Sequence, residues 1–244
     1  MAGGEAMSSH RPPGKLYIVG VGPGDPDLMT MKAVRIIGMA DAIAYPVTES
    51  GKSRARRIAA EFITHHHSII DYTLPMSVDP APAQAAYDEV ANKMRTELDA
   101  GRTVALLCEG DPFLYGSGTH IYNRLSNQYE TTVIPGVTSL TASAAASGEP
   151  LVVRNEILKV LPAPLPAEKL KSELQDFDRA TIIKLGRHFQ KVYGVLQELQ
   201  LVESAVLISN ASADEQAVTP LNQVDPASGE YFAMILVSRG EVQQ

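Results

Sequence analysis

The sequence places residues that could do chemistry in two turns of the same type. Gly24-Asp25-Pro26 and Gly110-Asp111-Pro112 each follow soon after an apolar run. Glycine lets a ligand approach the backbone closely, and aspartate followed by proline is typical of a helix start. Because ligands of open α/β sheets bind at the carboxyl ends of parallel strands, the two turns predict one shared crevice. The alternative interpretation is that each is only a capped turn.

The first turn belongs to GVGPGDPDLM, residues 20–29. This segment resembles a nucleotide-binding loop but lacks a phosphate site. The dinucleotide fingerprint is G-x-G-x-x-G, and Asp25 stands where its third glycine belongs. A carboxylate there would repel a pyrophosphate. Gly51-Lys52-Ser53 ends like a phosphate loop, but Pro46 replaces that loop's first glycine. The sequence therefore predicts a ligand that carries no phosphate.

The second turn carries two carboxylates, on Glu109 and Asp111. Either could take a proton from a reacting carbon, and either could instead hydrogen-bond a ligand or cap a helix. The residue types alone leave the catalytic base unassigned.

Basic residues that could hold an acidic substrate occur in two places. Arg54 and Arg57 are three residues apart, so a helix would put them on one face, where each could grip a carboxylate with two hydrogen bonds. Lys184 and Arg187 are a second candidate pair. Each pair could also be a solvated basic surface.

Metal or thiol chemistry is not expected. His65-His66-His67 has no further cysteine or histidine close by in sequence and is interpreted as a polar approach to a strand. Cys108 closes an apolar run and is interpreted as a small buried residue. A single cysteine also excludes an internal disulfide and fits a reducing cytoplasm.

Composition excludes several classes of partner. The formal charge of −7 predicts no nucleic-acid surface, so an anionic ligand needs a local basic patch. No apolar run approaches the roughly twenty residues of a membrane span. We therefore expect a cytoplasmic protein that binds neither nucleic acid nor a membrane.

Strand and helix patterns alternate along the chain, which predicts α/β layers with parallel strands. The first helix is expected to start at Pro26 with Asp25 as its N-cap. Ala217–Leu221 and Phe232–Val237 have no clear helix between them and predict an antiparallel end. The other strands are expected at 15–19, 42–45, 68–74, 103–108, 132–135, 181–185 and 205–209, and the other helices at 53–62, 84–100 and 192–199.

Three segments are expected along the chain. Residues 1–14 are polar and rich in glycine and proline, and are interpreted as a disordered leader. An N-terminal α/β domain is placed at 15–118 and a C-terminal α/β domain at 119–244. The proline-spaced LPAPLP at 161–166 marks the wider boundary region.

Five motifs, in this order, resemble those of the tetrapyrrole methylases of cobalamin and sirohaem synthesis. They are GVGPGDPDLMTMKA, EGDPFLYGS, VIPGVTSLTASAAASGEPL, IIKLGRHF and YFAMILV, and they extend over nearly the whole chain after the leader. Finer details, such as YPVTESGKSRARRIA and KVLPAPLP, are most similar to the members that methylate C20 of precorrin-2 or of cobalt-factor II.

The resemblance implies two tandem α/β domains with S-adenosylmethionine in a cleft between them, and a homodimer. It implies methylation of C20 of precorrin-2 to give precorrin-3A, or of cobalt-factor II in the anaerobic route, with no metal cofactor. Uroporphyrinogen methylases tend to have Gly-Gly-Asp where this chain has Glu109-Gly110-Asp111, which weakens that assignment. The cofactor contacts carried over by position are Pro23, Glu109, Gly110, Asp111, Thr138, Ser139, Leu185, Ala211 and Ala233.

Two other classes of function stay open on the residues. A nucleotide-dependent oxidoreductase would rest on Gly20-x-Gly22 alone, and cofactor binding would separate it from a methylase. A tetrapyrrole carrier without turnover would bind the substrate but add no methyl group.

Overall fold

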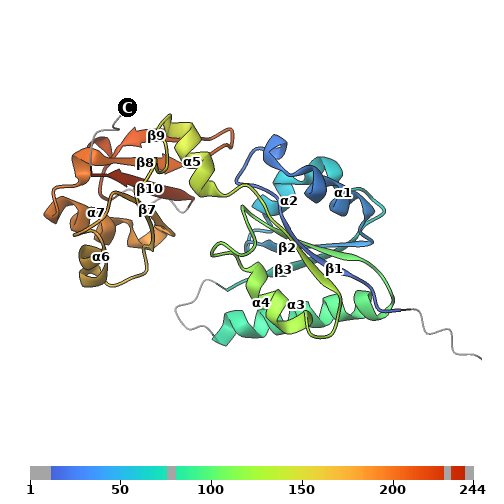
Figure 1. Cartoon of the computed structure of the whole chain (residues 1–244). Coiled ribbons are helices and arrows are strands. Elements are labelled where there is room, and N and C mark those ends of the chain that lie inside the picture. The colour runs from blue at the N-terminus through green and yellow to red at the C-terminus, as the bar shows by residue number, and fades with distance from the viewer. Residues whose placement is uncertain (1–11, 76–80, 228–231, 240–244) are drawn as a thin grey trace, which may run out of the picture. The chain divides into compact units, whose positions relative to one another are not determined.

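The computed structural model describes residues 12–75, 81–227 and 232–239. The chain forms two compact units. The first comprises the chain up to Gly22 and from Pro26 to Val137, and the second comprises Pro23–Asp25 and the chain from Thr138 onward. Each unit contains one five-stranded sheet (Figure 1).

The first unit contains the parallel sheet that the alternating pattern predicted. Its order is β3-β2-β4-β1-β5, and every pairing is parallel. Gly20 pairs with Cys108, so the carboxyl ends of β1 and β4 are level. The strands are β1 (Leu16–Gly20), β2 (Ala42–Val47), β3 (Ser68–Thr73), β4 (Val104–Cys108) and β5 (Thr131–Ile134).

Helices cover both faces of this sheet, which explains why its central strands are apolar throughout. Helices α1 (Met31–Met39) and α2 (Arg54–Ile58) pack on one face, and α3 (Ala81–Asp99) and α4 (Gly118–Leu125) on the other (Figure 1). All five residues of β4 are buried.

The first helix does not start where the sequence predicted. Pro26–Leu28 forms a short 3-10 turn, and α1 begins at Met31 with Thr30 as its N-cap. The Thr30 Oγ1 accepts a hydrogen bond from the Ala33 N–H at 3.1 Å. Asp25 as the N-cap was therefore wrong, because a competing threonine cap lies five residues further along the chain.

The first unit also extends beyond the expected end of the N-terminal domain. We expected the break between residues 118 and 119, but this point lies inside α4, and both α4 and β5 belong to the first unit. β5 pairs with β1, with Leu16 opposite Thr131. The glycine-rich end of DPFLYGSG is the loop before α4, whose Ile121 and Leu125 are fully buried in the first core.

The second sheet is mixed, with the order β6-β7-β10-β8-β9. The antiparallel end is confirmed, because β10 pairs antiparallel with β7 and β8, and β8 pairs antiparallel with β9. Its strands are β6 (Leu158–Pro162), β7 (Arg179–Ile183), β8 (Ala205–Ser209), β9 (Ala217–Pro220) and β10 (Ala233–Ser238).

Strand β6 was not predicted from the sequence, because the prolines around this strand were interpreted as a connection. β6 is an edge strand that pairs parallel with β7, and Pro162 is its last residue. Proline is tolerated at such a position, since its missing N–H interrupts no central ladder.

Helices also cover both faces of the second sheet. Helices α6 (Ala167–Glu173) and α7 (Phe189–Glu198) pack into one core, and α5 (Ser139–Ser147) packs on the other face. Small residues of α5, including Ala142 and Ala144, are buried there, which allows the helix to approach the sheet closely.

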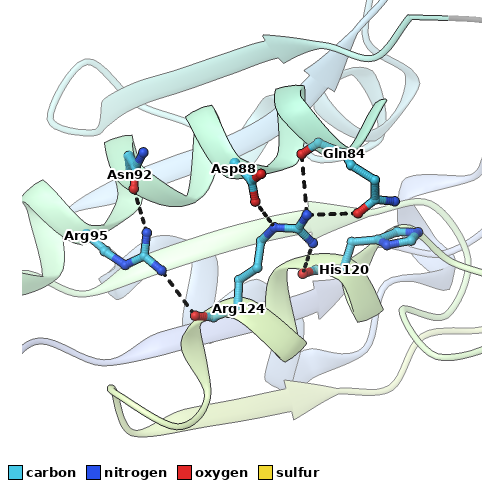
Figure 2. A network of polar contacts seen from close by, with 6 residues as sticks. All are labelled: Gln84, Asp88, Asn92, Arg95, His120 and Arg124. Carbon is cyan, nitrogen blue, oxygen red and sulfur yellow. Dashed lines mark hydrogen bonds and ion pairs between the residues drawn. The ribbon is translucent and has the colours of Figure 1, made fainter. Parts of the chain in front are cut away.

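An arginine network joins α3 to α4 in the first unit (Figure 2). Arg124 of α4 donates through Nε to Asp88 at 2.7 Å and through Nη2 to the Gln84 side chain at 2.8 Å, both on α3. Its guanidinium also lies over the Tyr87 ring, which stacks on His120. The network fixes the helix that directly follows the EGDPFLYGSG loop.

The expected leader at residues 1–14 falls only partly within the described residues. Of the leader at 1–14, residues 1–11 lie outside the described residues, and the Gly14 N–H already donates to the Leu98 carbonyl at 2.7 Å.

Within the described ranges, no helix combines the length and apolarity needed to cross a bilayer.

Candidate cofactor and substrate site

Two glycine turns meet at the carboxyl edge of the first sheet. The Gly110 N–H donates to the Gly22 carbonyl at 2.8 Å, and the Gly22 N–H donates back at 3.4 Å. Gly110 adopts a left-handed conformation, with φ of 60°. The turns after β1 and β4 therefore lie side by side, as their shared sequence pattern predicted.

A third glycine, after β5, completes a backbone-only junction. A Cβ atom on Gly136 would lie 2.0 Å from the Gly110 carbonyl oxygen, and a Cβ on Gly20 would lie 2.6 Å from the Gly136 nitrogen. No side chain fits at either position. Three strand ends thus present main chain, rather than side chains, at this edge.

The Asp111 carboxylate holds this junction together. Its Oδ2 accepts from the Gly136 N–H at 3.1 Å. Its Oδ1 accepts from the N–H groups of Phe113 and Leu114 at 2.9 and 3.2 Å. Both oxygens are occupied by backbone donors, which supports the capping interpretation of Asp111.

Glu109 has a different environment, although it is only two residues away. Its side chain is 34% exposed, and its Oε2 lies 3.9 Å from the Nε of Arg54 on α2. Burial raises the pKa of Glu109, and the positive charges of Arg54 and Arg57 oppose that rise. The two arginines act on one carboxylate, as a shared helical face predicts.

The Ser53 N-cap orients the basic segment at the start of α2. Its Oγ accepts from the Arg56 N–H at 3.2 Å. The Arg54 side chain is only 10% exposed, whereas Arg57 is exposed. The segment therefore points one arginine inward beside Glu109 and leaves a second one accessible.

In the second unit, the candidate cofactor residues gather at one edge of the mixed sheet. Leu185 follows β7, Ala211 follows β8, and Ala233 begins the antiparallel β10, opposite Ser209. All three are buried. Lys184 and Arg187 lie at the same strand end as Leu185 and are exposed.

The backbone at this edge adopts left-handed conformations at residues other than glycine. The φ angles are 59° at Lys184, 51° at Asn210 and 64° at Ser212. Such conformations are uncommon and concentrate at functional sites. The sequence analysis did not single out Asn210 or Ser212, and only their position directly after an apolar strand could have indicated them.

The first glycine turn contributes a segment to the second unit. Pro23–Asp25 belongs to that unit, and the Asp25 N–H donates to the Ser212 Oγ at 3.1 Å. A Cβ on Gly24 would lie 2.9 Å from the Ala213 nitrogen. Pro23 is thereby held next to the turn that contains Ala211.

The start of α5 belongs to the same edge. Thr138 is its N-cap, and its Oγ1 accepts from the Thr141 N–H at 3.4 Å. Leu140, next to Ser139, packs with Ile183 and Ala211. Within the second unit, Pro23 and the start of α5 therefore lie near the turn that contains Ala211, and Leu185 and Ala233 lie at the ends of the neighbouring strands β7 and β10.

The surroundings of Cys108 and of His67 are those of residues with a structural role. Cys108 is buried, and burial raises the pKa of its thiol to about 12. His67 accepts from the Thr64 N–H through Nδ1 at 2.9 Å, and its Nε2 lies 3.0 Å from the Ile37 carbonyl oxygen. The interpretation of Cys108 as a small buried residue is confirmed.

A protein-family model matches most of the chain. Residues 15–225 match the model of the Tetrapyrrole (Corrin/Porphyrin) Methylases. The chain belongs to this family. The match extends through both units, from β1 to the segment that follows β9.

Similar curated proteins are named for cobalamin synthesis. Cobalamin biosynthesis protein CobIJ of Mycobacterium tuberculosis is 39% identical over 93% of this chain, but this chain spans only 46% of that protein. Precorrin-2 C(20)-methyltransferase of a Sinorhizobium species is 34% identical, over 92% of this chain and 95% of that protein. Cobalt-precorrin-2 C(20)-methyltransferase of Salmonella typhimurium is 31% identical, over 93% and 97%.

Solved structures support the fold. Cobalt precorrin-4 methyltransferase CbiF has a TM-score of 0.72 at 23% identity, over 92% of this chain and 94% of that one. Uroporphyrin-III C-methyl transferase from Thermus thermophilus, complexed with S-adenyl homocysteine, has a TM-score of 0.67 at 21% identity, over 92% of both chains. The expected tetrapyrrole methylase fold, with an α/β sheet in each of two units, is confirmed.

Proposed function

We propose that the chain is an S-adenosylmethionine-dependent methyltransferase that methylates C20 of precorrin-2 to give precorrin-3A in cobalamin biosynthesis. The observation that carries this proposal is the glycine junction of Gly20, Gly110 and Gly136, with carboxylates beside it. The missing Cβ atoms let the three turns pack backbone against backbone, and the adjacent acids disfavour phosphate. A cofactor with an adenosine and a sulfonium cation, but no phosphate, is compatible with these acids.

The proposed cofactor contacts in the first unit are the main-chain groups of Glu109, Gly110 and Asp111. Because both Asp111 oxygens already accept backbone hydrogen bonds, Asp111 would act by holding the turn. The family resemblance adds contacts from the second unit, at Pro23, Thr138, Ser139, Leu185, Ala211 and Ala233.

When bound, S-adenosylmethionine supplies an activated methyl group, whose bond to sulfur breaks with the electron pair going to sulfur as the bond to C20 forms. The protein's contribution is to align the reacting carbon with that methyl group and to exclude water. Arg54 and Arg57, with Lys184 and Arg187, are the proposed anchors for the substrate's carboxylates. These cations offset the formal charge of −7, which opposes the approach of an anion.

Methylation of cobalt-factor II is the second candidate, because the Salmonella typhimurium relative is named for a cobalt-bearing substrate. The deciding experiment incubates the purified chain with S-adenosylmethionine and either precorrin-2 or cobalt-factor II. A mass gain of one methyl group in one product assigns the substrate. No gain in either product, with binding retained, would indicate a carrier and refute the proposed activity.

We further propose that the chain forms a homodimer. Phe113 and Tyr115 are 49% and 45% exposed on the loop before α4, and large exposed apolar side chains that lie close together are typical of interfaces. Sedimentation at micromolar concentration should give a dimer. A fully active monomer at that concentration would refute the proposal.

A further inference from the structure

We propose that Glu109 is the base that removes the proton from the methylated carbon, and that Arg54 is the residue that positions its carboxylate. This inference rests on the proposed function, since it concerns the second half of the same reaction. It separates two neighbouring acids that the sequence could not distinguish.

Asp111 is not available as the base. Its two oxygens accept three backbone hydrogen bonds, from Gly136, Phe113 and Leu114. Protonating Oδ2 would weaken its part-buried hydrogen bond from the Gly136 N–H, which is unfavourable. Asp111 therefore stabilises the turn and is a poor proton acceptor.

The Glu109 carboxylate, in contrast, can still accept a proton or a hydrogen bond. Its contact with Arg54 is 3.9 Å, which is an ion pair but too long for a hydrogen bond. The side chain is 34% exposed, so a ligand can reach it. Its backbone continues directly into Gly110 of the glycine junction, which places this carboxylate beside the proposed cofactor site.

Proton transfer to Glu109 balances the reaction in atoms and in charge. After methyl transfer, the attacked carbon carries both its hydrogen and the new methyl group, and the macrocycle has gained one positive charge. A Glu109 carboxylate oxygen takes the hydrogen as a proton, and the C–H electron pair returns to the ring system. The macrocycle loses its added charge, and the Glu109 carboxylic acid later releases its proton to water. No oxidant or reductant is required.

The groups around Glu109 act on its pKa in opposite directions. Arg54 and Arg57 face it from α2, and Cys108 and Asp111 are the nearby titratable groups on its own segment. Burial raises the pKa of Glu109, which makes it more basic than an exposed glutamate, while the positive charges of the two arginines limit that rise. Activity should therefore fall as pH decreases through this raised pKa. Removing the Arg54 charge should raise the pKa further and move that acidic limb to higher pH.

The test compares Glu109→Gln, Arg54→Ala and Arg54→Lys with the wild-type chain. Glu89→Gln is the matched control, because that glutamate is exposed on α3 and pairs with Lys93. The substrate carries deuterium on the reacting carbon, and its loss is followed by mass spectrometry. Glu109→Gln should lower the rate of deuterium loss by about 100-fold or more, with cofactor affinity within threefold of wild type. The methylated product should transiently retain its deuterium.

A second readout needs neither cofactor nor substrate. Carbon-13 NMR of glutamate carboxyl groups in the ligand-free protein should show one raised titration that disappears in Glu109→Gln. It should move to higher pH in Arg54→Ala and return towards the wild-type value in Arg54→Lys. An unchanged titration in Arg54→Ala would overturn the role of Arg54.

The remaining outcomes separate the two proposals. Wild-type rates in Glu109→Gln, with the acidic limb retained, would refute the base assignment while leaving the methyltransferase intact. Equal losses of cofactor affinity and rate would make the Glu109 carboxylate a cofactor ligand, which would also overturn the base assignment. If the wild-type chain methylates neither tetrapyrrole, the proposed function is wrong and the base assignment fails with it.

Discussion

The Oδ2 of Asp111 accepts a hydrogen bond from the Gly136 N–H at 3.1 Å, and so ties the turn after β4 to the turn after β5. Asp111→Asn should weaken this tie, because an amide nitrogen cannot accept the hydrogen bond that one carboxylate oxygen now accepts. We expect a loss of about 1–3 kcal/mol in the free energy of unfolding, measured by urea denaturation. Asp71→Asn, at an exposed position of β3, is the control. Equal small effects in both variants would contradict this role for Asp111.

Gly136→Ala should disrupt the glycine junction. Its Cβ would lie 2.0 Å from the Gly110 carbonyl oxygen, so the backbone of one turn must move. We expect cofactor affinity to fall at least about tenfold, which corresponds to about 1.4 kcal/mol, in isothermal titration calorimetry. Gly38→Ala is the matched control, since its Cβ meets no atom within 4 Å. Unchanged cofactor binding in Gly136→Ala would show that the junction is not the binding site.

Arg54→Ala combined with Arg57→Ala should raise the apparent substrate constant while leaving cofactor affinity nearly unchanged. The double variant removes two cations from one face of α2, and substrate carboxylates would lose their bidentate partners. Because Arg54 also faces Glu109, kcat should fall as well. Steady-state kinetics measure both effects, with exposed Arg56→Ala as the control.

Two results would change that interpretation of the arginines. If the affinities for cofactor and substrate fall equally, the cluster is structural. If neither changes, the substrate is anchored elsewhere, and the same measurement on Lys184→Ala combined with Arg187→Ala becomes decisive.

Arg124→Ala should destabilise the first unit by about 2 kcal/mol, because a single guanidinium holds side-chain and backbone acceptors on both α3 and α4 (Figure 2). Arg124→Lys should recover only part of this, since an ammonium group cannot reproduce the planar fork. Urea denaturation measures both variants. Lys93→Ala, which removes an exposed ion pair on α3, is the control and should change stability by well under 1 kcal/mol.

Cys108 should resist alkylation in the folded protein at pH 8, because burial raises its thiol pKa to about 12. In the unfolded chain the thiol has an ordinary pKa, so the folded state holds its proton more tightly. This contribution to stability is present below the unfolded pKa and is lost as pH rises towards about 12. Denaturation curves of wild type and Cys108→Ala should therefore converge at alkaline pH. Rapid native-state alkylation would contradict the prediction.

The sequence by itself determined the layered α/β character and most strands. Apolar runs such as 103–108 are long enough to be buried on both faces, and their alternation with helical patterns leaves few other architectures. It also marked both glycine turns, since glycine, aspartate and proline restrict the backbone locally. β6 and the start of α1 could not be obtained this way. At Pro162 a local turn signal competed with pairing to β7, and at Asp25 it competed with a better cap at Thr30.

Only the tertiary structure decided which acid serves which role and where the first unit ends. Asp111 and Glu109 have similar chemistry, but Asp111 meets Gly136 from another strand, whereas Glu109 meets Arg54 from α2. The first unit continues to Val137 because β5 pairs with β1, more than a hundred residues earlier. Hydrogen bonds between distant segments depend on how the chain packs, and no local pattern of residue types encodes them.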